Sequence, residues 1–374
     1  MKKIYFPNLN GLRFIAALLV IIHHTENWKS AFNLNNYAKV PSVHILGKLG
    51  VILFFVLSGF LITYLLLNEK KETKDISVKD FYLRRVLRIW PLYYLIVILV
   101  LFVFPQFNFF KLEFNTTQID FFKSFLFLAG APNLALAVGI VIPFLALTWS
   151  IGVEEQFYLM WPWIIKKNVV SLKLFVTIFL MYLLIKSGIF VLDEQFNNRG
   201  TDILMKFWNS FVISSMTIGA VFAYILFEGK SQLIRFIFNK YFQFFVYVLI
   251  FVLLLFGIKF PFIHYELYAL IFGVIIINLA GNKDASIISL ENKPMNYLGK
   301  VSYGLYIFHP IAIFLSIKLL TKLDLVSNNI LLYFAILLLT VFIASLSYSF
   351  YESWFLKSKK KFSTILSGEK SHEI

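Results

Sequence analysis

The sequence has no cysteine among its 374 residues, so disulfide bonds, thiolate metal sites and cysteine nucleophiles are all excluded. Charged residues are also scarce: they make up 15% of the chain, against about 25% in a typical soluble domain. A Walker loop, a Rossmann fingerprint and the spacing of metal ligands are all missing. The sequence therefore shows no motif of a soluble nucleotide-binding enzyme, and we predict no metal site.

Apolar residues take the place of charge and account for 59% of the chain. They gather in runs of about twenty residues, the length that crosses a bilayer as a helix. We therefore predict an all-α, polytopic integral membrane protein with about ten transmembrane helices. The predicted spans are 8–25, 47–67, 87–105, 144–165, 169–190, 208–228, 241–258, 262–281, 302–320 and 329–353.

Lysine and arginine orient these spans. The net charge of +15 would by itself suggest a nucleic-acid partner. The basic residues instead cluster in alternate loops, as the positive-inside bias requires of a membrane protein. The N-terminus, the stretch 70–88, the pair 166–167 and the C-terminal tail all fall on one side. We predict a multi-pass protein of the cell (cytoplasmic) membrane with both termini cytoplasmic, and no nucleic-acid partner.

The predicted domain organisation is simple. Residues 1–355 form one transmembrane domain, and 356–374 form a basic cytoplasmic tail, which we interpret as a solvated juxtamembrane segment able to contact anionic lipid headgroups. The first apolar run is not followed by a small-residue cleavage site, so we interpret it as a retained helix and not a signal peptide. Residues 107–143 are apolar enough for an eleventh span, but glycines and prolines interrupt them, and a crossing would invert the later loops. We interpret them as an outward re-entrant or interfacial segment.

Arg13 and His24 lie in the first span, LNGLRFIAALLVIIHH, eleven positions apart. That spacing is close to three helical turns, so both side chains emerge on one face, separated by roughly 16 Å. Ionisable groups within a membrane usually mark a site or a pathway. The pair predicts an anion anchor with a base further along the same stripe. The competing interpretation of His24 is an interfacial histidine near a helix end.

Arg85 and Arg88 stand where the third span begins, in FYLRRVLRIWPLYY. Three positions apart, they share a helix face and can bind one phosphate group together. Guanidinium groups suit bidentate phosphate recognition better than a lysine ammonium does. The competing interpretation is that these arginines only set the topology of an inner loop.

Glu154 and Glu155 stand in the fourth span, in LTWSIGVEEQFYLMWP. Ser150, Glu154 and Tyr158 are spaced by four and form one polar stripe, whereas Glu155 shares its row with apolar residues. We therefore expect Glu154 to face the interior and either to tune a histidine or to act as a base.

His309 precedes Pro310 in SYGLYIFHP, where the proline leaves a backbone carbonyl free to accept a hydrogen bond. A catalytic and a structural role for His309 are both open. Ser58 and Gly59 lie in GVILFFVLSGFLI, and this Ser-Gly pair is typical of a close helix contact rather than of a nucleophile.

The chain resembles the acyltransferase-3 family of multi-pass membrane proteins over nearly its whole length. The resemblance rests on an Arg-x10-His signature, an Arg-x-x-Arg pair and a Ser-x-x-x-Glu-x-x-Phe-Tyr motif. These match Arg13 and His24, Arg85 and Arg88, and Ser150, Glu154, Phe157 and Tyr158. The stretches GVILFFVLSGFLI and SYGLYIFHP are also similar to the family. The resemblance implies ten spans and transfer of an acyl group, usually acetyl from acetyl-CoA, to a hydroxyl of an extracytoplasmic glycan or glycoside.

This implication assigns roles to the candidate residues. His24 would take the proton of the acceptor hydroxyl or carry the acyl group transiently, with Glu154 tuning it. Arg85 and Arg88 would bind acyl-CoA, a co-substrate and not a permanently bound cofactor. Arg13 would hold the pantetheine or pyrophosphate, or stabilise the oxyanion. The acyl group would pass to the acceptor directly or through a separate partner acyltransferase.

Two alternatives stay open at this point. A proton-coupled secondary transporter of an anionic small molecule would also need intramembrane Arg, His and Glu. Against this alternative, the sequence shows no inverted repeat. A related enzyme using another donor, such as succinyl-CoA, is equally compatible with the sequence.

Overall fold

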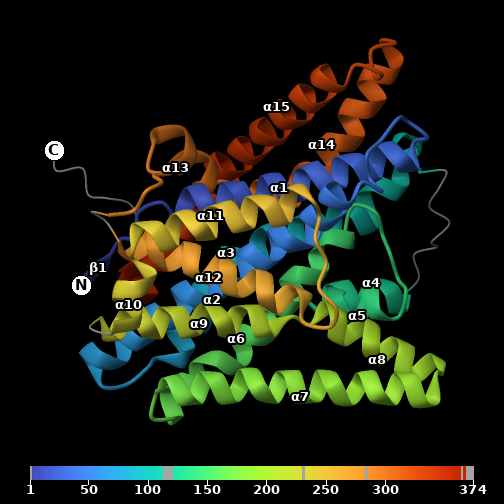
Figure 1. Cartoon of the computed structure of the whole chain (residues 1–374). Helices are drawn as coiled ribbons and strands as arrows, with labels where there is room; N and C mark the ends of the chain where they lie inside the picture. The colour runs from blue at the N-terminus through green and yellow to red at the C-terminus, as the bar shows by residue number, and fades with distance from the viewer. Residues whose placement is uncertain (1, 113–120, 230–231, 283–284, 364, 368–374) are drawn as a thin grey trace.

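The computed structural model describes residues 2–112, 121–229, 232–282, 285–363 and 365–367. Its described part is almost entirely helical, and the long helices pack side by side (Figure 1). A helix lies at each of the ten predicted spans. They are α1 (Leu9–Ala31), α2 (Pro41–Thr73), α3 (Val78–Ile98), α6 (Trp149–Lys167), α7 (Leu172–Phe196), α9 (Ile213–Glu228), α11 (Lys240–Leu255), α12 (His264–Gly281), α14 (Ser302–Lys322) and α15 (Asn329–Ser347).

Shorter elements connect these helices. The α-helical ones are α4 (Phe121–Leu128), α5 (Pro132–Ala137), α8 (Arg199–Ser210), α10 (Gln232–Ile237), α13 (Lys293–Lys300) and α16 (Ser353–Lys359). Two π-helical segments, Leu99–Val103 and Tyr348–Glu352, extend α3 and α15. Single 3-10 turns occupy Phe104–Gln106, Asn108–Phe110, Ala146–Thr148 and Lys360–Phe362.

Seven helical segments of the described chain are long and apolar enough to cross a membrane. The predicted polytopic all-α class is therefore confirmed. The other three predicted spans correspond to α1, α6 and α11; α1 and α6 carry the ionisable residues singled out above, and α11 has only 16 residues. Helices alone do not show which of them cross, so the count of ten spans and the cytoplasmic termini stay predictions.

Helix α2 lies at the centre of the bundle and packs against α1, α9, α12 and α6. Its contact with α9 is very close. A Cβ atom added to Gly59 would clash with the Met216 carbonyl, and one added to Gly219 would clash with the Val56 carbonyl. Small residues let membrane helices approach in this way, so Gly59 has the packing role that its sequence context predicted. Helices α7 and α15 lie at opposite edges of the bundle (Figure 1).

The ends of the described chain meet at one end of the bundle. Strand β1 (Lys2–Ile4) pairs in parallel with β2 (Ile365–Ser367). At the opposite end lie α4 and α5 (Figure 1). These two helices have eight and six residues, and a helix that crosses a bilayer needs about 20. Neither is long enough to cross alone, in agreement with the re-entrant or interfacial interpretation of 107–143; residues 113–120 lie outside the described part.

Candidate active site

Two histidines from α1 and α14 meet inside the bundle. His24 Nδ1 lies 2.7 Å from His309 Nε2, and the two rings stack with centroids 5.0 Å apart. His309 is fully buried, while His24 is only partly so. One proton is shared across this contact, so the tautomer of one ring fixes that of the other. When His24 Nδ1 donates to His309, Nε2 of His24 is left as a free lone pair and can act as a base.

A cavity of about 220 Å³ opens beside His24. Its wall combines aromatic, basic and hydroxyl side chains from several helices, among them His23, Lys48, Trp149, Ser210 and Tyr306. A volume of this size holds several water molecules at about 30 Å³ each, so a polar substrate group has room next to the imidazole.

Glu154 forms a second cluster, between α6 and α2. Ser58 Oγ donates to Glu154 Oε1 at 2.7 Å, and the Tyr158 hydroxyl donates to the same oxygen. Ser58 Oγ and Tyr158 OH are also 2.6 Å apart. The expectation that Glu154 and Tyr158 face the interior is therefore confirmed. Ser58 belongs to the cluster as well. Its hydroxyl therefore has a hydrogen-bonding role, in addition to the packing role of its neighbour Gly59.

The structure corrects two details of this stripe. Ser150 does not join Glu154 but lies 2.8 Å from the Tyr306 hydroxyl, and both Ser150 and Tyr306 donate to the Leu147 carbonyl. Ser150 thus supports Tyr306, whose ring is 5.9 Å from that of His309. Within the described chain, the partner of His24 is His309 and not Glu154. Glu154 is hydrogen-bonded to two hydroxyls and not to His24, so any tuning of the histidine would be indirect, and the catalytic role of Glu154 stays a prediction.

Glu155 points to the other side of α6. Trp90 Nε1 donates to Glu155 Oε2 at 3.1 Å, and Trp90 is 41% exposed. Leu159, one turn further along, is 59% exposed. Leu159 thus lies at the periphery, whereas Ile151, on the same row of α6, is buried.

Arg13, Arg85 and Arg88 form one basic cluster. It lies near the N-terminal end of α1, within electrostatic range of Glu154. Arg13 Nη1 donates to Asn10 Oδ1 at 2.8 Å and lies within electrostatic range of Arg85, Arg88 and Glu154. The Arg85 guanidinium lies 5.4 Å from the ring centroid of Tyr158. The predicted shared face of Arg85 and Arg88 therefore brings both close to Arg13.

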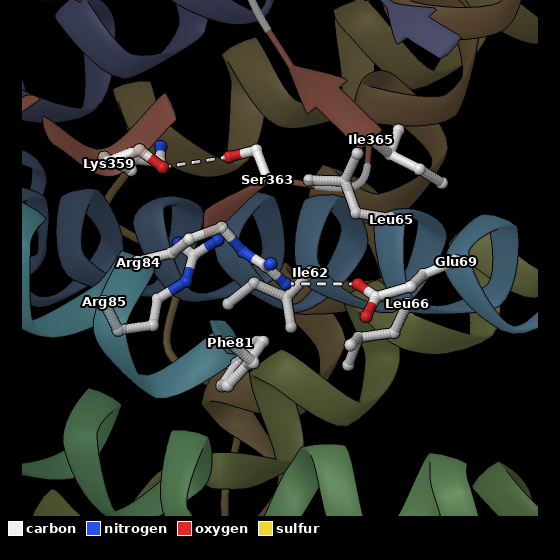
Figure 2. A pocket seen from close by; sticks show the side chains of 10 residues that line it. All are labelled: Ile62, Leu65, Leu66, Glu69, Phe81, Arg84, Arg85, Lys359, Ser363 and Ile365. Atoms are coloured by element: carbon white, nitrogen blue, oxygen red, sulfur yellow. Dashed lines mark hydrogen bonds and ion pairs between the residues drawn. The ribbon is translucent and has the colours of Figure 1, made fainter. Parts of the chain in front are cut away.

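Arg84 has a different, structural role. It is buried, forms an ion pair with Glu69 at 3.2 Å and donates to the Phe362 carbonyl at 2.5 Å. A small cavity of about 20 Å³ separates Arg84 and Arg85 from the C-terminal segment (Figure 2). Figure 2 also shows Lys359 and Ser363 on the far side of this cavity. The described part of the basic tail therefore packs on α2 and α3 and adds Lys359 to the basic cluster.

Arg84→Ala is expected to lower the free energy of unfolding by about 3–5 kcal/mol, because it leaves the buried Glu69 without its cation. Thermal unfolding in detergent measures this loss. Lys79→Ala, an exposed position on the same helix, serves as the control and should leave the transition unchanged. Equal transitions for Arg84→Ala and the wild type would contradict the structural role.

The histidine cavity and the arginine pocket lie at opposite ends of α2. Gly47, Lys48 and Val51 line the first, and residues 62–69 line the second. Eleven residues from Val51 to Ile62 correspond to roughly 16 Å, the same separation as that of Arg13 and His24 along α1. Ser58, Glu154 and Tyr158 lie between the two. The residues thus form a line from a cation-rich end to a histidine-bearing cavity.

The sequence did not predict several of these contacts. The pairing of His309 with His24, the place of Ser58, and the approach of Lys48 and Lys359 all depend on contacts between distant segments. The only advance signals were the polar residues themselves, placed within otherwise apolar runs.

Fold and site together define a helical membrane protein with a histidine pair towards one end of α1 and α2 and a basic cluster towards the other. The chain belongs to the acyltransferase-3 family: the family model described as an acyltransferase domain matches residues 6–349. This membership places it among the acyltransferases. No solved structure matches it significantly.

Curated relatives carry O-acetyltransferase names. The chain is 30% identical to the peptidoglycan O-acetyltransferase OatA of Listeria monocytogenes over 176 residues, 42% of this chain and 24% of that protein. It is 27% identical to the O-acetyltransferase OatA of Staphylococcus aureus (strain MRSA252), covering 98% of this chain and 60% of the relative. A putative O-acetyltransferase of Staphylococcus aureus (strain COL) is 26% identical, with 95% and 58% covered. The chain thus spans about 60% or less of these relatives.

Proposed function

We propose that this chain is a membrane O-acyltransferase that moves an acetyl group from acetyl-CoA on the cytoplasmic side to a hydroxyl of an extracytoplasmic glycan or glycoside. The observation that carries the proposal is the arrangement along α1 and α2, with a histidine-bearing cavity at one end and an arginine cluster at the other. Family membership and the names of the relatives support acyl transfer to a glycan.

The arginine cluster is the donor end of this proposal. CoA carries a pyrophosphate and a phosphomonoester, and Arg85, Arg88 and Arg13 supply guanidinium groups suited to them. Arg13, Arg85 and Arg88 lie within electrostatic range of one another, and the repulsion among these close cations is relieved when a polyanion binds. The thioester at the far end of the pantetheine arm then extends towards the histidines.

His24 performs the chemistry at the acceptor end. Its Nε2 takes the proton of the acceptor hydroxyl as the oxygen attacks the thioester carbonyl, while Nδ1–H donates to His309. The C–S bond then breaks, and the proton held by the imidazole neutralises the departing CoA thiolate. Alternatively, Nε2 itself accepts the acyl group and passes it to the hydroxyl in a second step. Arg13 either holds the pyrophosphate or stabilises the oxyanion.

In this proposal Glu154 lies between the arginine cluster and the cavity beside His24. Its charge offsets part of the arginine cluster, and its hydrogen bonds fix Ser58 and Tyr158 between donor and acceptor ends. It therefore acts on the thioester-bearing arm and not on the imidazole.

The proposed setting is the cytoplasmic membrane, crossed ten times with both termini inside. The ten helices fit this count, and the pairing of β1 with β2 puts both ends of the described chain on one side of the bundle. Membrane lipids surround it, and the acyl group goes to the glycan directly or through a separate partner acyltransferase.

Radiolabelled acetyl-CoA tests the proposal with the purified chain in proteoliposomes. Transfer of label to a glycan acceptor, or hydrolysis of the thioester that depends on the protein, supports an acyltransferase. Uptake of an anion without thioester cleavage supports the secondary transporter instead and contradicts the proposal.

The double variant Arg85→Ala/Arg88→Ala is expected to weaken acetyl-CoA binding by at least a hundredfold, because two charge-assisted contacts of about 1.5–3 kcal/mol each are removed. Calorimetric titration in detergent measures this affinity. Lys74→Ala/Lys79→Ala removes the same charge from exposed positions nearby and should bind as the wild type does. Unchanged affinity in the arginine variant would leave these residues as topology determinants only.

A further inference from the structure

Lys48 brings a positive charge to the wall of the cavity that holds His24. Its Nζ donates to the Asn209 carbonyl at 2.6 Å and lies 4.1 Å from the ring centroid of Tyr265. These contacts satisfy part of the ammonium group but do not neutralise it. Within the described part of the chain Lys48 forms no ion pair, although a cation inside a membrane protein is costly without one.

Glu266, a carboxylate within electrostatic range of Lys48, is already engaged. Both oxygens of Glu266 contact Lys186 Nζ, at 3.1 and 3.2 Å, and Ser214 donates to one of them at 3.3 Å. Lys48, Lys186 and Glu266 together therefore leave one positive charge without a carboxylate, at the wall of the cavity. This surplus favours an anionic occupant.

The same wall offers an aromatic surface. Trp149 lines the cavity, with the Lys48 ammonium 5.8 Å from its ring centroid. An indole ring packs well against the C–H face of a sugar, through dispersion contacts over a broad flat area. A cation and an indole side by side thus match a sugar ring that bears an acidic group.

We propose that the cavity beside His24 binds an acidic sugar as acceptor, with Lys48 binding its carboxylate and Trp149 packing against its ring. This inference rests on the proposed function and names the class of its acceptor. The contact with Lys48 orients the ring, so that one of its hydroxyls lies at His24 Nε2. Lys48 is then a specificity-determining residue, and neutral sugars bind less tightly.

N-acetylmuramic acid and its methyl ester test this proposal, because they differ by one negative charge. Binding of each to the purified full chain is measured by calorimetry. The wild type is expected to bind the acid at least tenfold more tightly than the ester. Lys48→Met should abolish this preference, and Lys48→Arg should restore it. Lys39→Met, which removes an exposed lysine just before α2, should keep the full preference.

Equal binding of acid and ester by the wild type overturns the proposal, as does a preference that survives in Lys48→Met. A parallel loss of both affinities in Lys48→Met also overturns it, since that pattern indicates a packing role. Transfer from labelled acetyl-CoA is measured separately. A chain that selects the acid through Lys48 but transfers no acetyl group contradicts the proposed function and not this inference.

Discussion

The His24→Ala variant is expected to lose acyl transfer by a factor of about 10²–10⁴ while remaining inserted and folded. The imidazole lines the cavity and is also hydrogen-bonded to a second, fully buried histidine. Alanine removes the lone pair that takes the hydroxyl proton. Transfer of label from acetyl-CoA to a glycan acceptor, at matched protein amount, measures the loss.

Two other histidine variants make this result specific. His44→Ala changes an exposed histidine near the same end of the bundle and should retain full activity. His309→Gln keeps a hydrogen-bonding group beside His24 but disturbs its tautomer, so it should give an intermediate loss. If His24→Ala retains most of its activity while His309→Gln does not, His309 is the base and His24 supports it.

Much of the fold was readable from the sequence because apolar runs of helical length leave few alternatives in a membrane. The ends of the helices were predicted less accurately. Helix α1 continues to Ala31, past the predicted end at 25, because Glu26 and Lys29 are buried as an ion pair. Lys29 also donates to Asn329 in the distant α15, a contact that hydropathy alone does not reveal.

The candidate site was likewise predicted only in part from the sequence. Helical spacing correctly grouped Arg85 with Arg88 and Glu154 with Tyr158, because residues three or four apart share a face. It left Arg84 out of the arginine pair but gave it no role, since the role of Arg84 depends on Glu69 and on Phe362. It also did not pair His24 with His309, which lie 285 positions apart. Contacts between residues of different helices therefore could not be predicted from helical spacing.

Glu154→Gln is expected to lower turnover by about two orders of magnitude or more, whereas Glu155→Gln should lower it only slightly. Glu154 accepts hydrogen bonds from Ser58 and Tyr158 and faces the arginine cluster. The amide keeps the shape of the side chain but turns one acceptor into a donor and removes the charge that offsets the arginines. Glu155 accepts one hydrogen bond, from Trp90, and a glutamine oxygen can accept the same bond.

The two variants control for each other, because they make the same chemical change one residue apart on α6. Turnover of acetyl-CoA at matched expression, with thermal unfolding measured alongside, separates catalysis from stability. Glu154→Gln should lose turnover without a comparable loss of thermal stability, and Glu155→Gln should change neither by much. If Glu155→Gln proves the more damaging, the catalytic path does not run along the face of Ser58 and Tyr158. The row of Ile151, Glu155 and Leu159 on α6 would then be the one that meets the substrate.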